Sequence, residues 1–212
     1  MSSVSNGLLS GVQDMMHANP SWSSIGAGWP RAAGALVLGA ALVGAPALAR
    51  AAGMQLSSPT LRDGVAAAQR YDGPGCGGGN VSPALEWSGV PAATRSLALT
   101  VFDRDARGGA GWWHWAVVDI PASARGLPLG AGAPGGAGLP KGARQLRTSF
   151  GKEAYGGPCP PPGSGVHHYE FTLWALPQAR LPLPPGAGAP ELSEMASVGA
   201  IAEARLVVGY GR

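Results

Sequence analysis

The stretch that decides the fold is Gly151–Leu176, GKEAYGGPCPPPGSGVHHYEFTLWAL. Its first half is dense in glycine and proline, and such loops are rigid because proline fixes φ and glycine fits tight turns. Its second half alternates, with Tyr169, Phe171, Leu173 and Ala175 on one face, which predicts a β-strand. A rigid loop that ends in histidine is typical of a pocket wall, and the alternative is an ordinary surface turn before a core strand.

Two further apolar runs also predict strands. Ser96–Ala106, SLALTVFDRDA, ends abruptly in two carboxylates, the first of which is Asp103. After a glycine-rich turn, Gly111–Pro121, GWWHWAVVDIP, places His114 among three tryptophans. Strict alternation in this run puts the even-numbered residues from His114 to Ile120 on one face. The three strands together predict an all-β core.

Five motifs in a fixed order resemble one protein family. They are NVSPALEW, FDRDA, GWWHWAVVDIP, the block GGPCPPPGSGVHHYEFTLWAL and the closing GYGR. They are similar to the phosphatidylethanolamine-binding protein family, and more narrowly to its bacterial Raf-kinase-inhibitor-like branch, over roughly Met54–Arg212. The resemblance implies an all-β-dominated sandwich, with a large central sheet, a smaller sheet and a short C-terminal helix. The chain accordingly divides into two parts: a leader over residues 1–52, outside the resemblance and expected to be cleaved or disordered, and a domain over residues 53–212.

The resemblance further implies a small-anion pocket at one end of the sheet. Carried over residue by residue, its members are Asp103, His114, Gly157, Pro158, Pro161, His167 and Tyr169. Histidine suits this role because it donates a hydrogen bond to a phosphate oxygen near neutral pH. A neighbouring aspartate would orient an imidazole or bind an amine, and backbone N–H groups of the rigid loop would add fixed donors. The alternatives are a core histidine at position 114, a solvated histidine pair at 167–168 and a turn cap at position 103.

The chain departs from the family pattern at three positions close to this pocket. Arg104 and Arg107 stand where the family has proline, and His168 stands where it has arginine. The first two changes add positive charge and loosen the turn that presents Asp103, which leaves the identity of the ligand open.

The composition allows this assignment and argues against a nucleic-acid-binding protein and against a disordered chain. The chain has 212 residues and a formal net charge of +3, with lysine and arginine scattered along it. No basic stripe interleaved with aromatic residues points to nucleic acid. The chain contains 35 glycines and 20 prolines, which raises the question of disorder. The aromatic and β-branched residues nevertheless cluster into strand-like runs, which argues for a folded domain.

The N-terminus has the pattern of a targeting segment. Arg31 precedes the uncharged run Ala32–Ala49, which ends in the small residues Ala47-Leu48-Ala49, typical of a secretory signal with cleavage near residues 49–52. We therefore expect a periplasmic or secreted protein, with Met15 or Met16 as alternative starts. An uncleaved membrane anchor is the alternative.

The two cysteines fit an exported chain. Cys76 and Cys159 both lie in glycine-rich loops, and an even count in an exported protein makes them a disulfide candidate. Two free thiols are the alternative. No CxxC spacing exists, so we expect no metal site.

The remaining segments predict loops and one helix. Gly126–Lys141 and Leu181–Pro190 have turn chemistry without apolar periodicity. Glu191–Arg205 has apolar residues at helical spacing and is the best helix candidate. A final strand is expected over Leu206–Tyr210.

Three functions follow as hypotheses. The first is a binding protein for a small anion or lipid head group (phosphate, phosphoethanolamine or a carboxylate), without catalysis or a cofactor. The second is a protein-interaction module, such as a protease inhibitor, with a homodimer suggested by family analogy. The third is a hydrolase that uses the Asp/His pocket, against which stands the absence of a G-x-S-x-G motif or another activated nucleophile.

Overall fold

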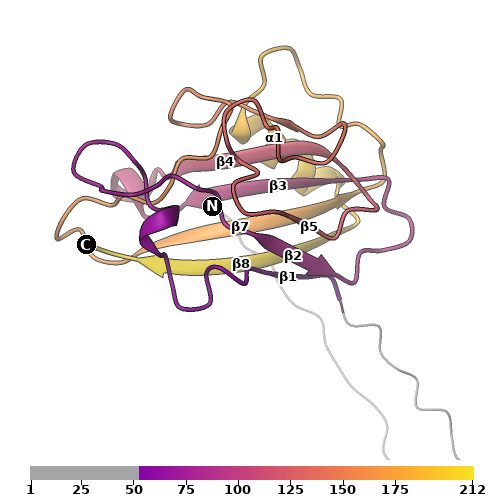
Figure 1. Cartoon of the computed structure of the whole chain (residues 1–212). Coiled ribbons are helices and arrows are strands. Elements are labelled where there is room, and N and C mark those ends of the chain that lie inside the picture. The colour runs from indigo at the N-terminus through magenta and orange to yellow at the C-terminus, as the bar shows by residue number, and fades with distance from the viewer. Residues whose placement is uncertain (1–52) are drawn as a thin grey trace, which may run out of the picture. The chain divides into compact units, whose positions relative to one another are not determined.

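The computed structural model describes residues 53–212, so the expected leader lies outside the described residues. Within this part, five strands form an antiparallel sheet in the order β6-β4-β3-β7-β8 (Figure 1). Their bounds are β3 Ser96–Asp103, β4 Trp112–Pro121, β6 Arg144–Gln145, β7 His167–Leu176 and β8 Ala202–Tyr210. A smaller sheet has the order β1-β2-β5, with β1 Gln55–Ser57, β2 Leu85–Ser88 and β5 Gly126–Leu127. The other elements are α1 Ala189–Gly199 and the 3₁₀ turns η1 Ala67–Gln69 and η2 Ala106–Gly109.

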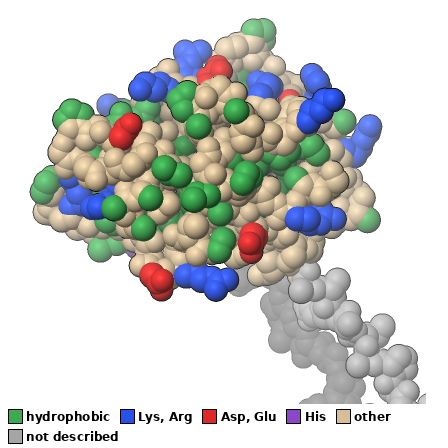
Figure 2. Space-filling model, viewed as in Figure 1, with side chains coloured by type: hydrophobic (Ala, Val, Ile, Leu, Met, Phe, Trp, Pro, Cys, Tyr) green, Lys and Arg blue, Asp and Glu red, His purple; other side chains and the backbone are tan. Residues whose placement is uncertain are grey.

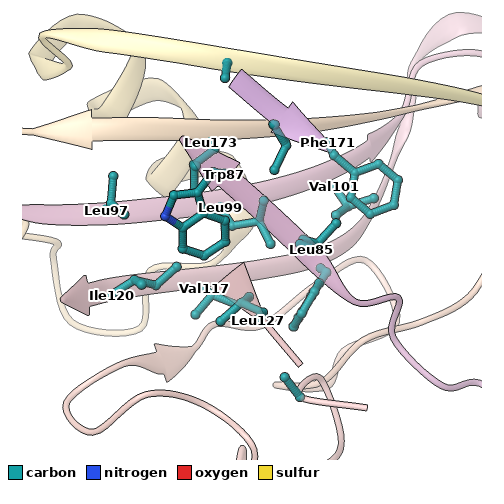
Figure 3. Packing of buried hydrophobic residues seen from close by; sticks show 14 of the residues in the cluster. Leu85, Trp87, Leu97, Leu99, Val101, Val117, Ile120, Leu127, Phe171 and Leu173 are labelled. Carbon is teal, nitrogen blue, oxygen red and sulfur yellow. The ribbon is translucent and has the colours of Figure 1, made fainter. Parts of the chain in front are cut away.

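Two apolar layers cover opposite faces of the larger sheet, because alternate residues of its strands enter different clusters. The first layer lies between the sheets, where Trp87 of β2 packs over Leu99 and Leu173 of the larger sheet (Figure 3). The second layer lies under α1, where Leu192 packs with Ala116 of β4. The expected all-β sandwich with a short helix near the C-terminus is confirmed.

Strand β4 breaks the expected alternation at two places. Its pairing with β3 slips by one residue between Trp113 and Trp115, so that His114 is the extra residue of a β-bulge. A second slip lies between Val117 and Ile120. The prediction that the even-numbered residues from His114 to Ile120 share one face is therefore wrong. Ile120 packs in the layer between the sheets, whereas Ala116 and Val118 pack under α1.

The C-terminal helix is shorter than predicted. Helix α1 ends at Gly199, and β8 begins at Ala202 rather than at Leu206. The apolar residues of this region fit helical spacing, but β8 pairs with β7 over nine residues, and alternate side chains from Ala202 to Val208 reach the core. Tertiary pairing therefore overrides the local helical pattern.

Each of the two predicted loops is anchored to the domain by a buried apolar residue. Gly126–Lys141 is a series of turns apart from β5, and it is anchored by the fully buried Ala131. Leu181 anchors the later loop in the same way. Over residues 53–212, no helix is both long and apolar enough to span a membrane. On the face shown in Figure 2, lysine and arginine side chains lie scattered and form no continuous stripe.

Candidate functional site

The candidate site lies at the edge of the larger sheet where β3 ends and β4 and β7 begin. Antiparallel pairing places Asp103, the last residue of β3, opposite Trp112 of β4 and Tyr169 of β7. A cavity of about 790 Å³ opens at this edge. Of the expected pocket residues, those that line it are Asp103, His114, Gly157, Pro161, His167 and Tyr169. Pro158 does not line it; it is buried behind the wall, where its carbonyl accepts a hydrogen bond from the backbone N–H of Tyr71 at 3.2 Å.

The bulge in β4 turns His114 toward the cavity, a common use of bulges beside functional sites. Its Nδ1 lies 2.6 Å from the carbonyl oxygen of Gly156. A carbonyl only accepts, so Nδ1 carries the proton. Burial lowers the pKa of His114 to about 4, although the Gly156 carbonyl and the charge of Asp103 oppose this shift. The ring is therefore neutral at pH 7, and its Nε2 presents a lone pair.

Asp103 and His167 form a buried pair. The Asp103 Oδ2 accepts a hydrogen bond from His167 Nδ1 at 2.8 Å. The other carboxylate oxygen accepts from the backbone N–H groups of Asp105 at 3.0 Å and Ala106 at 3.1 Å. These contacts fix the carboxylate, which in turn holds the His167 ring with a proton on Nδ1.

Ser164 is a cavity residue that sequence reasoning missed. Its Oγ lies 3.1 Å from His167 Nε2 and 2.8 Å from the carbonyl oxygen of Pro161. The available signal was a serine three residues before a histidine, inside the Gly-Ser-Gly turn. That spacing alone fits many surface turns, and only the fold brings Asp103 to the other side of the ring.

The hydroxyl of Tyr169 is buried in the cavity wall and has no hydrogen-bond partner among the described residues. Burial raises its pKa, and the negative charge of Asp103 adds to the effect. The group therefore stays a neutral donor. Within residues 53–212 no group meets the Tyr169 hydroxyl with good hydrogen-bond geometry, although the neighbouring Asp103 carboxylate interacts with it as an acceptor. A buried donor that lacks a well-formed hydrogen bond destabilises a fold by about 1–3 kcal/mol.

The glycine and proline loop forms one wall but offers fewer donors than expected. The backbone N–H of Gly157 donates to Asn80 Oδ1 at 2.7 Å, so it is not free to bind an anion. Three neighbours, Pro158, Pro160 and Pro161, have no N–H at all. Gly157 itself is required because a Cβ there would collide with the backbone of Gln69 and its neighbours.

Aromatic side chains and one cation surround the cavity mouth. Tyr71, Phe150 and Trp112 line it and are half-buried. The guanidinium of Arg107 lies 4.8 Å from the centroid of the Trp112 ring, within range of a cation–π interaction. The departure from the family pattern at Arg107 thus places a positive charge at the rim.

Asp105, at the same rim, is held by His168. Its Oδ2 accepts hydrogen bonds from the backbone N–H at 2.7 Å and from Nδ1 at 2.8 Å. These hydrogen bonds lower the pKa of Asp105. The third departure, His168, therefore pairs with a rim carboxylate and does not line the cavity.

Two links tie the loops that form the cavity wall. Cys76 and Cys159, which both line the cavity, are joined in a disulfide with a Cα–Cα distance of 5.7 Å. The guanidinium of Arg212 donates to the carbonyl of Pro160 at 2.7 Å and also to that of Gly75. The cavity shape therefore depends on a covalent bond and on a hydrogen-bonded clamp.

The residues present do not suggest a metal centre. Over residues 53–212, no group of three or more His, Cys, Asp or Glu side chains is arranged to hold a metal ion.

The tryptophans divide between core and wall: Trp87, Trp115 and Trp174 are buried, and Trp112 lines the cavity.

The all-β sandwich with an Asp/His/Tyr cavity at one sheet edge agrees with what sequence comparison finds. The model of the family described as phosphatidylethanolamine-binding protein matches residues 57–211. The chain belongs to the phosphatidylethanolamine-binding protein family.

Individual relatives support this assignment. UPF0098 protein YbcL of Escherichia coli K12 is 42% identical over 164 residues, which cover 76% of this chain and 90% of YbcL. The crystal structure of YbcL superposes with a TM-score of 0.72 and covers 76% of this chain and 99% of that structure. LppC of Mycobacterium tuberculosis, a protein named as a lipoprotein, is 39% identical over 73% of this chain and 70% of LppC.

Proposed function

We propose that the protein is exported and that its cavity binds a small phosphate-containing ligand: inorganic phosphate, phosphoethanolamine or a similar head group. The observation that carries this proposal is the Tyr169 hydroxyl beside the buried Asp103–His167 pair, because no residue from 53 to 212 gives this hydroxyl a hydrogen bond of good geometry. A ligand oxygen would accept the phenolic proton and satisfy the buried donor. Arg107, whose guanidinium lies 4.8 Å from the centroid of the Trp112 ring, would supply positive charge.

His114 limits which anions can bind in the cavity. Its Nε2 lone pair repels a fully ionised oxygen and accepts a hydrogen bond from an N–H or O–H group. A phosphate species that keeps one proton offers both an acceptor for Tyr169 and a donor for His114, as does the ammonium group of phosphoethanolamine. Sulfate and ionised carboxylates lack such a donor and fit less well.

Calorimetric titration of the domain with phosphate, phosphoethanolamine, acetate and sulfate tests this proposal at fixed ionic strength. We expect saturable binding of the first two ligands and much weaker binding of the others. Replacement His114→Ala should reduce the preference for phosphate over sulfate. The control is Ser197→Ala, an exposed helix residue whose hydroxyl contacts only the Glu194 carbonyl. If no ligand binds saturably, the proposal is wrong.

Export is proposed on two grounds. The Cys76–Cys159 disulfide suits an oxidising compartment, and the relative LppC is named as a lipoprotein. Expression of the full chain in a bacterium, followed by fractionation and intact-mass measurement, tests it. We expect a mature form that begins near residues 50–53 outside the cytoplasm; a full-length cytoplasmic product would contradict export.

A further inference from the structure

Three cavity side chains have the connectivity of a serine hydrolase triad. Ser164 Oγ lies 3.1 Å from His167 Nε2, and His167 Nδ1 lies 2.8 Å from Asp103 Oδ2. In such triads the imidazole uses these same two nitrogens for the serine and the carboxylate. Binding a phosphate-containing ligand does not require this alignment, because it leaves neither His167 nitrogen free to contact the ligand.

Burial suits each member to its role. Asp103 is 3% exposed and His167 is 6% exposed, so the carboxylate acts on the ring at short range with little solvent between them. Two backbone N–H groups hold the other carboxylate oxygen in place. Ser164 instead is exposed and lines the cavity, where a substrate can reach its hydroxyl.

The Ser164 hydroxyl has two acceptors for its single proton. Besides His167 Nε2, the Pro161 carbonyl lies 2.8 Å from Oγ, so rotation about one bond moves the proton between them. The backbone of Ser164 is held by the turn, because its N–H donates to the same Pro161 carbonyl at 3.1 Å. The adjacent Gly163 N–H donates to the carbonyl of Arg212 at 3.0 Å, which anchors the turn to the clamp residue.

A donor for the developing oxyanion is present in the same cavity. Tyr169 lines this cavity, and its hydroxyl has no hydrogen bond of good geometry within residues 53–212. A fixed tyrosine donor can stabilise an oxyanion. This arrangement differs from most hydrolases, where backbone N–H groups serve, because the prolines of this loop lack them.

We propose that Ser164 is a nucleophile for acyl transfer, with His167 as general base and Asp103 as the residue that positions the ring. Ser164 Oγ would attack the carbonyl carbon of an ester while its proton moves to His167 Nε2. The C–O bond to the leaving alcohol then breaks, and the alcohol takes this proton. Water, deprotonated by the same nitrogen, next attacks the acyl-serine, which releases a carboxylic acid and restores the serine.

The mouth of the cavity defines the substrate class. Tyr71, Phe150 and Trp112 line the cavity, and their aromatic faces suit a flat aromatic group next to the ester bond. We therefore infer small aryl esters as substrates.

Covalent labelling with a fluorophosphonate probe, followed by peptide mass spectrometry, tests the nucleophile. We expect an adduct on Ser164 that forms at least about a hundredfold more slowly in His167→Ala, the lower range for loss of a general base. Exposed Ser197 provides the internal control within the same digest. Labelling of Ser164 no faster than Ser197, or unchanged labelling in His167→Ala, would overturn the proposal.

Hydrolysis of p-nitrophenyl acetate tests the positioning residue. In Asp103→Asn we expect kcat to fall by at least about a hundredfold with KM unchanged, because the amide holds the wrong tautomer; a rise in KM alone would indicate a structural role and contradict the assignment. Ser164→Ala should abolish the activity and leave the unfolding temperature unchanged. Loss of phosphate binding in every form, with labelling intact, would instead refute only the binding function proposed above.

Discussion

A side chain in the cavity can favour ligand binding and at the same time destabilise the fold, and Tyr169 is the clearest case. Its hydroxyl is buried without a partner, so Tyr169→Phe should raise the free energy of unfolding by about 1 kcal/mol. The same replacement should weaken phosphate binding by about tenfold, because a hydrogen bond to a charged group is lost. Urea unfolding and calorimetric titration measure the two effects.

Tyr155 supplies a matched control for this experiment. It is also buried, but its hydroxyl donates to the carbonyl of Gln69 at 3.0 Å. Tyr155→Phe should therefore lower the free energy of unfolding by about 1–2 kcal/mol. If both variants changed stability in the same direction, the unpartnered state of Tyr169 would not be the cause.

The lowered pKa of His114 predicts how the free energy of unfolding changes with pH. Its pKa is about 4 in the folded protein and 6.5 as the reference value, so the unfolded state binds more protons between these limits. Stability from this residue is complete above pH 6.5 and is lost as pH falls toward 4. Between pH 7 and 4.5 the native chain should lose about 2–3 kcal/mol more than His114→Gln does.

Paired urea titrations at the two pH values measure this difference. Carboxylates elsewhere titrate in both proteins, so only the difference between them reports on His114. Equal losses in the two proteins would show that the buried ring is already protonated or exchanges freely with solvent.

Much of the cavity could be predicted residue by residue, because its members sit in short sequence motifs at strand ends. Six of the seven predicted positions line the cavity. Tyr71 and Phe150 could not be predicted, since they reach the cavity through loop closure between segments far apart in sequence. Ser164 was missed because its spacing from His167 also fits an ordinary surface turn. The ligand-binding role of the whole set stays a prediction for the titrations above.

At the scale of elements, β4 shows why alternation alone fails. Bulges depend on how two strands pair, and that pairing is not visible in either strand alone. At the second slip, Asp119 has φ of 59°, a left-handed conformation that disfavours residues with branched side chains. Its carboxylate accepts from the Leu181 N–H at 3.2 Å and from Arg144 Nε at 3.3 Å.

This geometry predicts the effect of two replacements at Asp119. Asp119→Val loses both acceptors and strains the backbone, and should lower the free energy of unfolding by about 2–4 kcal/mol. Asp119→Asn tolerates the conformation and keeps an acceptor for Leu181, so its loss should be under about 1 kcal/mol. Equal losses in urea unfolding would show that charge pairing with Arg144, and not backbone geometry, controls this position.

At the scale of the whole molecule, the disulfide closes a long loop. Cys76 and Cys159 are 83 residues apart, and loss of such a link should lower the free energy of unfolding by about 4–5 kcal/mol in the loop-entropy account. The double variant Cys76→Ala/Cys159→Ala, compared with the oxidised protein by urea unfolding, measures this loss. Adding a reductant should destabilise the native chain and leave the double variant unchanged.

The same bond has a consequence for where the protein can work. Its two sulfurs belong to the wall of the cavity, so the environment that forms the bond also completes the proposed binding site. We expect copies retained in a reducing cytoplasm to hold ligand weakly, and copies that have crossed a membrane to hold it well. Transport would then act as the maturation step, and the chain would collect its cargo only after arrival.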